Sequence, residues 1–155
     1  MATIRVTGIE QLIAKMERLT DNHEEKMKRI VYAGTGVVAD AVRSNLESVP
    51  TSIPDHYYKK GEKQPGPDPD QKNAIINAFG ISKIKREGGS YSAKVGFKGG
   101  QEANGVKVTT LARRVESGTS WMQKHPFSRP GLNQSRSKAI EAMKEELENQ
   151  LNEVL

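Results

Sequence analysis

Cysteine is absent from this chain of 155 residues, and aromatic residues make up only 5% of it. Without cysteine there is no disulfide, no thiolate zinc site and no cysteine nucleophile, a pattern that fits a reducing compartment. Because hydrophobic residues are only 35% of the chain, the core must be built mainly from Val, Ile, Leu, Met and Ala. Such a modest core predicts help from partner subunits.

Long hydrophobic runs are also lacking. No apolar run approaches the roughly 20 residues that a membrane helix needs. The start of the chain, "MATIRVTGIEQL", has no basic segment followed by an apolar one, as a secretion signal would. We expect a soluble protein without a membrane partner, made in the cytoplasm and folded as a single domain over residues 1–155.

The charge is unevenly distributed along the chain, which carries 24 Lys and Arg against 19 Asp and Glu. The middle is basic, whereas the segment after Ala139 is mostly acidic, and such polarity can orient subunits in an assembly or simply keep a surface solvated. The basic residues that could contact phosphates without reading bases are Lys83, Lys85, Arg86, Lys94 and Lys98. A basic face that only solubilises the protein explains them equally well.

Hydrophobic spacing predicts the order of the elements. Ile4 and Val6 alternate with polar residues in a short strand, and a short helix follows from Ile9 to Leu19. After Thr20, Asp21 and Asn22, which are N-cap candidates, apolar residues three and four apart predict the principal helix up to Val49. The small residues of "AGTG" within it favour close packing of another element.

Residues 49–70 contain five of the seven prolines and show no periodicity, so we expect a long loop or arm. Loops of this length tend to be functional or to order on assembly. His56, Tyr57 and Tyr58 in its middle are therefore candidate subunit contacts. Asp70 is the expected N-cap of a short helix that follows, with Ala74 and Phe79 on its apolar face.

The rest of the chain predicts a hairpin and two helices. Gly88-Gly89 is the expected turn of a hairpin, because apolar residues alternate strictly from Tyr91 to Phe97. A short helix should end at Gly118, and a long helix past Pro130 should bury Ile140, Met143, Leu147, Leu151 and Val154 or Leu155. The fold class is α+β: a small antiparallel sheet packed against a long central helix and a long C-terminal helix, with an extended proline-rich loop.

Two constellations suggest catalysis, and neither has the required spacing. Ser117, Ser120, His125 and Glu116 contain the residue types of a hydrolase, but "ESGTSWM" lacks the second glycine of a nucleophile elbow. His56, Asp68 and their neighbours Asp55 and Asp70 could supply a metal site, yet the prolines and the helix start explain the aspartates better. We expect no enzyme activity and no cofactor. The alternative is a small metal-dependent enzyme or toxin that cleaves nucleic acid.

The segment "RRVESGTSWMQKHPFSRPGLNQSRSKAIEAM" resembles the C-terminal signature of the tail-completion proteins, also called head-tail joining or minor tail proteins, of long-tailed double-stranded DNA bacteriophages. The matching positions are Val115, Glu116, Gly118, Thr119, Pro126, Phe127, Arg129 and Pro130. Val6, Gly8 and Leu12 match the family's start. The sequence departs from the family pattern at Ser117, where an aromatic residue is common, and at Gly131, where alanine is usual.

This resemblance implies a non-enzymatic ring, a hexamer, at the phage neck or the head-proximal end of the tail. The head connector or the tail tube would be its partner, and double-stranded DNA would pass through its lumen in the virion. We expect the basic hairpin to line the DNA channel or to face a neighbouring ring. Gly118 should end the short helix. Phe127 should anchor against the core the extended segment that leads from that helix to the long C-terminal helix, and Arg129 should pair with Glu116. Trp121, Met122 and His125 are the remaining subunit-contact candidates.

Overall fold

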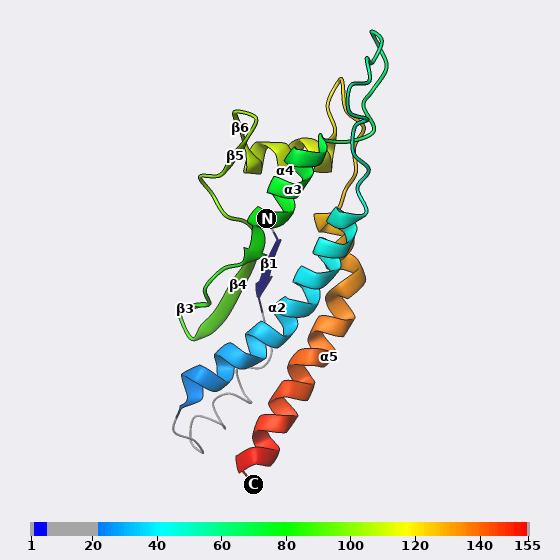
Figure 1. Ribbon diagram of the computed structural model, residues 1–155. Helices are drawn as coiled ribbons and strands as arrows, with labels where there is room; N and C mark the ends of the chain where they lie inside the picture. The colour runs from blue at the N-terminus through cyan, green and yellow to red at the C-terminus, as the bar shows by residue number, and fades with distance from the viewer. Residues whose placement is uncertain (1, 6–21, 155) are drawn as a thin grey trace.

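In the computed structural model of the protein, residues 2–5 and 22–154 are described (Figure 1). The helices are α2 (His23–Glu47), α3 (Pro69–Ala78), α4 (Val108–Ser117) and α5 (Ser128–Val154). The strands are β1 (Ala2–Arg5), β2 (Phe79–Ile81), β3 (Lys85–Glu87), β4 (Ser90–Phe97), β5 (Glu102–Ala103) and β6 (Val106–Lys107). The α+β prediction is confirmed. The helix expected between Ile9 and Leu19, as well as Val6, Gly8 and Leu155, lies outside the described residues.

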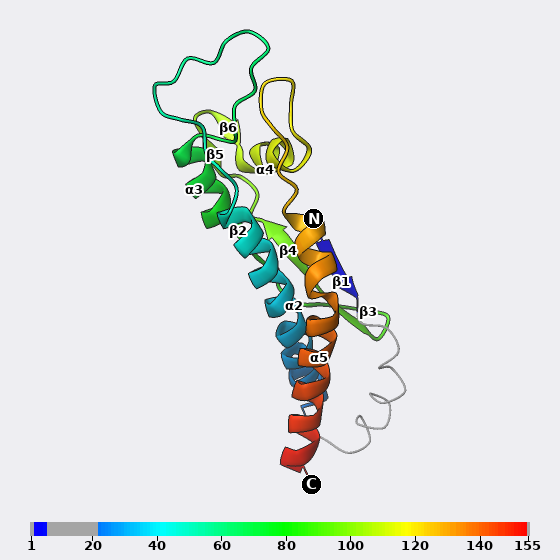
Figure 2. The ribbon, with the colours of Figure 1, turned by 90° about the vertical axis from the view of Figure 1, so that its right-hand side faces the viewer.

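Helices α2 and α5 run side by side in opposite directions and form the long axis of the molecule (Figures 1 and 2). Their contact is close because glycines replace side chains at two positions. A Cβ atom on Gly34 would lie 2.6 Å from Met143, and one on Gly131 would lie 2.7 Å from Val42. Gly36, by contrast, faces open space. The close packing predicted for "AGTG" therefore rests on Gly34 alone.

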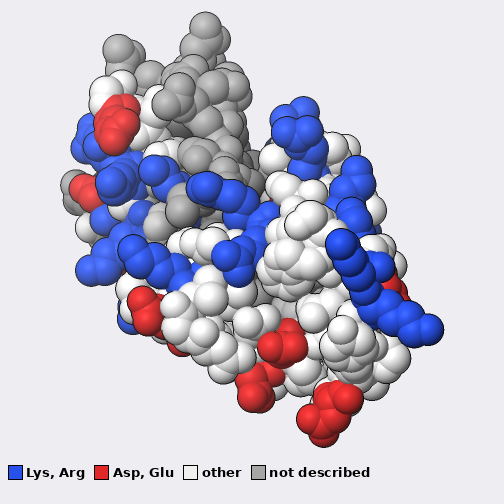
Figure 3. Space-filling model, turned by 90° about the horizontal axis from the view of Figure 1, so that it is seen from above, with Lys and Arg blue, Asp and Glu red and all other residues white. Residues whose placement is uncertain are grey.

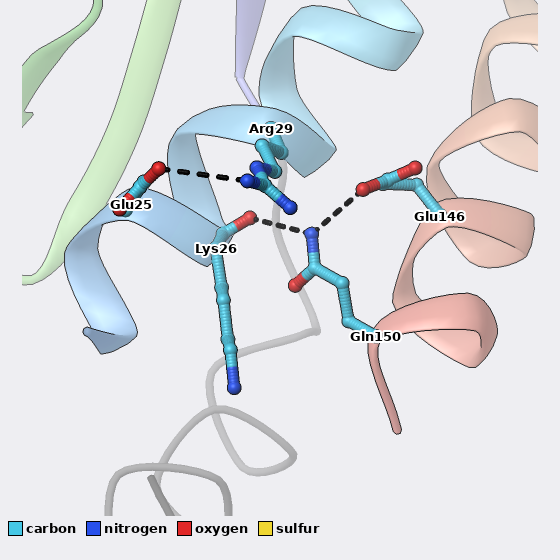
Figure 4. Close-up of polar contacts among 5 residues, drawn as sticks. All are labelled: Glu25, Lys26, Arg29, Glu146 and Gln150. Carbon is cyan, nitrogen blue, oxygen red and sulfur yellow. Dashed lines mark hydrogen bonds and ion pairs between the residues drawn. The ribbon is translucent and has the colours of Figure 1, made fainter. Parts of the chain in front are cut away.

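A buried glutamine joins α2 and α5 near the start of α2 (Figure 4). The side-chain amide of Gln150, only 1% exposed, donates to the carbonyl of Lys26 at 3.2 Å and to Oε1 of Glu146 at 2.8 Å. Because a buried polar group needs a partner, these bonds favour a single register of the two helices.

Strand β4 is the centre of the sheet. It pairs antiparallel with β1 on one side and with β2 and β3 on the other. Tyr91, Ala93 and Val95 are buried against the helices, while the residues between them face outward. The predicted hairpin is confirmed, and Gly88 and Gly89 form its turn with φ of 56° and 85°. Such positive φ values strain a residue with a side chain.

One helix start agrees with the prediction and one differs. Asn22, one of the three candidates, is the N-cap of α2, but it acts through a left-handed backbone and makes no side-chain cap bond. Asp70 is not the N-cap of α3; that position belongs to Asp68, which forms a capping box with Gln71 and is followed by Pro69. Proline suits the first turn because its missing N–H has no helical partner there.

Three further features depart from the sequence reading. Helix α5 begins at Ser128, so Pro130 lies in its first turn. Ile140 was expected on the buried face of α5 but is 45% exposed, whereas Met143 and Leu147 are buried as predicted. The two-residue strands β5 and β6 form a small antiparallel pair, which was not predicted because the sequence there shows no hydrophobic alternation.

Candidate functional site

A glycine ends α4 and begins a crossing segment that leads to α5. Gly118 has φ of 73° and donates its backbone N–H to the carbonyl of Arg114 at 2.7 Å. A Cβ atom there would lie 2.8 Å from Cβ of Lys124 and 3.0 Å from its backbone nitrogen. Both the backbone angle and the crowding therefore require glycine, and the predicted helix end at this residue is confirmed.

The carboxylate of Glu116 caps the start of α5. Its Oε2 accepts from the backbone N–H groups of Phe127 and Ser128 at 3.0 and 3.1 Å, and its Oε1 accepts from that of Arg129 at 3.4 Å. The first N–H groups of a helix lack helical partners and carry partial positive charge, so an acidic side chain stabilises them. The expected ion pair between Arg129 and Glu116 is wrong, because Glu116 contacts the backbone of Arg129 instead.

Phe127 lies in the core at the point where the crossing segment enters α5. Its side chain is 2% exposed, and its ring meets the ring of Phe97 edge to face at a centroid distance of 5.9 Å. Its carbonyl accepts from the side-chain amide of Asn45 at 3.3 Å. The residue thus connects α5, the sheet and the end of α2.

His125 and Glu116, two of the residues that suggested a hydrolase, are bonded to different parts of the backbone. The backbone N–H of His125 donates to the carbonyl of Val115 at 2.7 Å, and Nε2 of His125 contacts the carbonyl of Pro65. The Glu116 carboxylate is occupied by the backbone of α5. Thr119 accepts through its hydroxyl from the backbone of Trp121 and Met122. Through these bonds the crossing segment is connected to α4, to the arm and to the start of α5.

The proline-rich arm and the crossing segment are bonded to each other. Gln64 donates its backbone N–H to the carbonyl of Trp121 at 2.8 Å, and Gln123 donates to the carbonyl of Gln64 at 2.9 Å. Both loops rise together beyond the end of α2 (Figures 1 and 2). We call residues 53–65 and 119–125 together the platform. Sequence reasoning missed this pairing, because the two loops are far apart along the chain and share no periodicity.

The arm is held in shape at its base and at its tip. At the base, Ser52 donates its backbone N–H to the carbonyl of Pro67 at 2.9 Å. At the tip, the hydroxyl of Tyr58 accepts from the backbone of Ile53 at 2.9 Å, and the ring of His56 stands edge-on to that of Tyr58 at 4.6 Å. Tyr57 points outward and is 85% exposed.

Of the other candidates for subunit contact, Trp121 lies at the surface and Met122 lies in the core. Trp121 is 43% exposed, with the guanidinium carbon of Arg114 5.8 Å from the centre of one of its rings. Met122 is 2% exposed and packs in the core, so its side chain is not part of the exposed surface that the sequence suggested. The short β-bridge between Met122 and Gln64 explains this, because it turns the Met122 side chain towards the core.

The outer face of the sheet carries a basic groove. Lys85, Lys94 and Lys98 line it together with Gly80 and Gly96, which pair across β2 and β4. Its volume is about 550 Å³, and no acidic residue is among the described residues that line it. In the view from above, lysine and arginine side chains gather on two sides of the molecule (Figure 3).

The other two basic candidates lie elsewhere. Lys83 is exposed between β2 and β3 and does not line the groove. Arg86 pairs with Tyr91 in the register and lies over its ring, with the guanidinium carbon 5.6 Å from the centroid. Since Tyr91 is on the helix-facing side of β4, Arg86 points away from the groove.

In the described part of the chain, no three His, Asp or Glu side chains gather in a group that could hold a metal ion. Asp68 accepts instead from the hydroxyl of Ser52 at 2.7 Å, and Nε2 of His56 lies 4.0 Å from Oε1 of Glu62. At the start of α2, a hydrogen bond from Lys28 and its charge lower the pKa of Glu24, and the two form an exposed pair.

None of the described helices is long and apolar enough to span a membrane.

A family model described as "Bacteriophage HK97-gp10, putative tail-component" matches residues 10–118. The chain therefore belongs to this family of bacteriophage tail components and has a structural role in the virion. No curated protein and no solved structure matches it. The matched range ends at Gly118, so the roles of Pro126 to Pro130 rest on the structure alone.

Proposed function

We propose that the protein forms a closed hexameric ring at the phage neck or the head-proximal end of the tail and joins the tail to the head around the DNA. Its membership in a tail-component family supports a place in the virion. The observation that carries the DNA part of the proposal is the groove of Lys85, Lys94 and Lys98 on the face of the sheet opposite α2 and α5 (Figure 1).

The chemistry of the groove suits passage of DNA better than its capture. The three lysines lie exposed on a floor that includes Gly80 and Gly96, so ammonium groups can meet phosphates without a rigid clamp. Contacts of this kind are independent of base sequence and weaken with salt. Lys83 extends the same charge along the hairpin, whereas Arg86 is engaged with Tyr91 and is not assigned to the lumen.

The DNA contact is tested by changing Lys83, Lys85, Lys94 and Lys98 together to Ala. The matched control changes Arg113, Arg136, Lys138 and Lys144, which are also exposed, so that both variants lose four positive charges. We expect only the hairpin variant to weaken DNA binding and to lower the salt slope by about 3 to 4, near 0.9 for each lost phosphate contact. Equal behaviour of the two variants would refute the lumen assignment.

The place in the virion is tested by removing the protein from phage production and imaging the products. We expect DNA-filled heads and finished tails that remain separate, and joining should be restored when the protein is supplied in trans. Native mass measurement of the ring gives the subunit number, for which we expect six. Normal particles without the protein would overturn the joining role.

A further inference from the structure

The platform presents apolar side chains to solvent on loops that the structure holds in a defined shape. Ile53 is 59% exposed, Tyr57 is 85% exposed and Trp121 is 43% exposed. Exposed aromatic side chains on ordered loops are typical of protein contacts, in which tyrosine and tryptophan bury large areas at low entropic cost. Because hydrogen bonds already hold the arm to the crossing segment, these loops should lose little conformational entropy when a partner binds.

The charge around these side chains is positive. Lys59, Lys60 and Lys63 are exposed in the arm and Lys124 is exposed in the crossing segment, and they outnumber the exposed acids Asp55 and Glu62 of the arm. Glu62 already accepts from the backbone N–H of Lys59 at 3.1 Å. Arg114 lies beside the Trp121 ring. A partner for the platform should therefore offer an acidic surface that also contains an apolar residue.

Helix α5 offers such a surface on the same chain. Glu141, Glu145 and Glu148 are four and three residues apart, so they share one side of the helix, and all three are exposed. Lys144 is exposed on the same side, where the three glutamates outnumber it. Ile140 borders this side and is 45% exposed, whereas Leu132 and Leu151 of the same helix pack against the core. We call this side the acidic face of α5.

We infer that the platform of one copy docks on the acidic face of α5 of a neighbouring copy, with Tyr57 and Ile53 against Ile140 and the arm lysines against the three glutamates. The inference rests on the ring proposed above and names the contact that would close it. The two surfaces differ, so each copy uses its platform on one neighbour and its α5 on the other. Repetition of such a contact generates a ring when the rotation closes.

The absence of cysteine allows a direct test in the full-length protein, because introduced cysteines are its only thiols. Ser120 lies in the platform and is exposed, and Ser137 lies one turn before Glu141 on the acidic face and is exposed as well. The double variant Ser120→Cys/Ser137→Cys, treated with a short bismaleimide at high protein concentration, should give a ladder of covalent oligomers. The control Ser120→Cys/Glu87→Cys, with its second thiol at the exposed hairpin turn, should give none.

Charge reversal then tests the chemistry of the contact. In the Ser120→Cys/Ser137→Cys background, Lys59→Glu/Lys60→Glu/Lys63→Glu should reduce the ladder at least about tenfold, since like charges across an interface cost several kcal/mol. Glu141→Lys/Glu145→Lys/Glu148→Lys should do the same. A chain that carries all six reversals should regain the ladder.

A missing ladder in the first variant, or a ladder of equal strength in the control, overturns the inference. So does failure of the six-fold reversal to restore it when circular dichroism shows the variants folded. Loss of DNA binding on arm reversal with an unchanged ladder would assign the arm to DNA instead. If the ladder forms but heads and tails still join without the protein, the contact stands and the joining role fails.

Discussion

The α2/α5 pair and the platform are built by different means. In the helix pair, buried apolar residues recur every three or four positions, and Gly34 and Gly131 let the two backbones approach. In the platform, single hydrogen bonds join loops from distant parts of the chain, and aromatic side chains stay in solvent. The first region draws its stability from area and packing, whereas the second draws its shape from a few bonds. Substitutions should therefore unfold the first and only loosen the second.

Phe127 stands where the two regions meet, so its removal should have the largest effect. Phe127→Ala should lower the free energy of unfolding by about 3–5 kcal/mol, because a fully buried aromatic ring leaves a cavity. Urea unfolding at a fixed protein concentration measures this loss. Tyr57→Ala is the control, since a side chain that is 85% exposed should change stability little. A loss below about 1 kcal/mol for Phe127→Ala would contradict its place in the core.

Replacing each glycine of the helix pair by alanine should change the stability by an amount that depends on the atoms around it. Gly131→Ala should cost about 1–3 kcal/mol, because its Cβ would meet both the side chain and the backbone of Val42. Gly34→Ala should cost less, since it meets only the flexible Met143 side chain. Gly36→Ala has open space and should stabilise α2 by up to about 1 kcal/mol. Thermal unfolding of the three variants tests the order, and an equal effect at all three positions would refute it.

The link between the regions depends on the Glu116 cap. Glu116→Gln keeps an acceptor but removes the charge that faces three backbone N–H groups, so the expected loss is about 0.5–2 kcal/mol. Arg129→Gln is the matched control, because Arg129 contributes its backbone and should not respond. If Arg129→Gln destabilises the protein as much as Glu116→Gln, the result would indicate an ion pair between the two side chains.

The smallest effect is expected within the platform. Gln64→Pro removes the N–H that bonds to the carbonyl of Trp121, so it should loosen the arm and cost at most about 1 kcal/mol. The amide of Gln123, which donates to Gln64, should then exchange faster with solvent while amides of α2 keep their protection. Gln64→Ala leaves the backbone donor in place and should preserve the exchange rate. Global loss of protection would show that the platform stabilises the whole fold.

The difference between the regions also explains which predictions were confirmed. The alternation from Tyr91 onward and the glycine pair before it predicted the hairpin, because both signals act within a few residues. Helix spacing predicted α2 and the burial of Met143 and Leu147 for the same reason. The predicted burial of Ile140 was wrong, because residue spacing shows which residues share a face of α5 but not how much of that face α2 covers. Asp68 was missed as the N-cap because two aspartates flank Pro69 and only the folded loop places one against Ser52.

The sequence by itself determined the class of fold, the order of its main elements and membership in a family of bacteriophage tail components. Those features depend on local periodicity, turn residues and residue types. Only the tertiary structure decided that Glu116 caps α5, that the arm is bonded to the crossing segment, and that three of the five basic candidates share one groove. These contacts join residues distant in the chain, and their partners are selected by the packing of α2, α5 and the sheet rather than by neighbouring sequence.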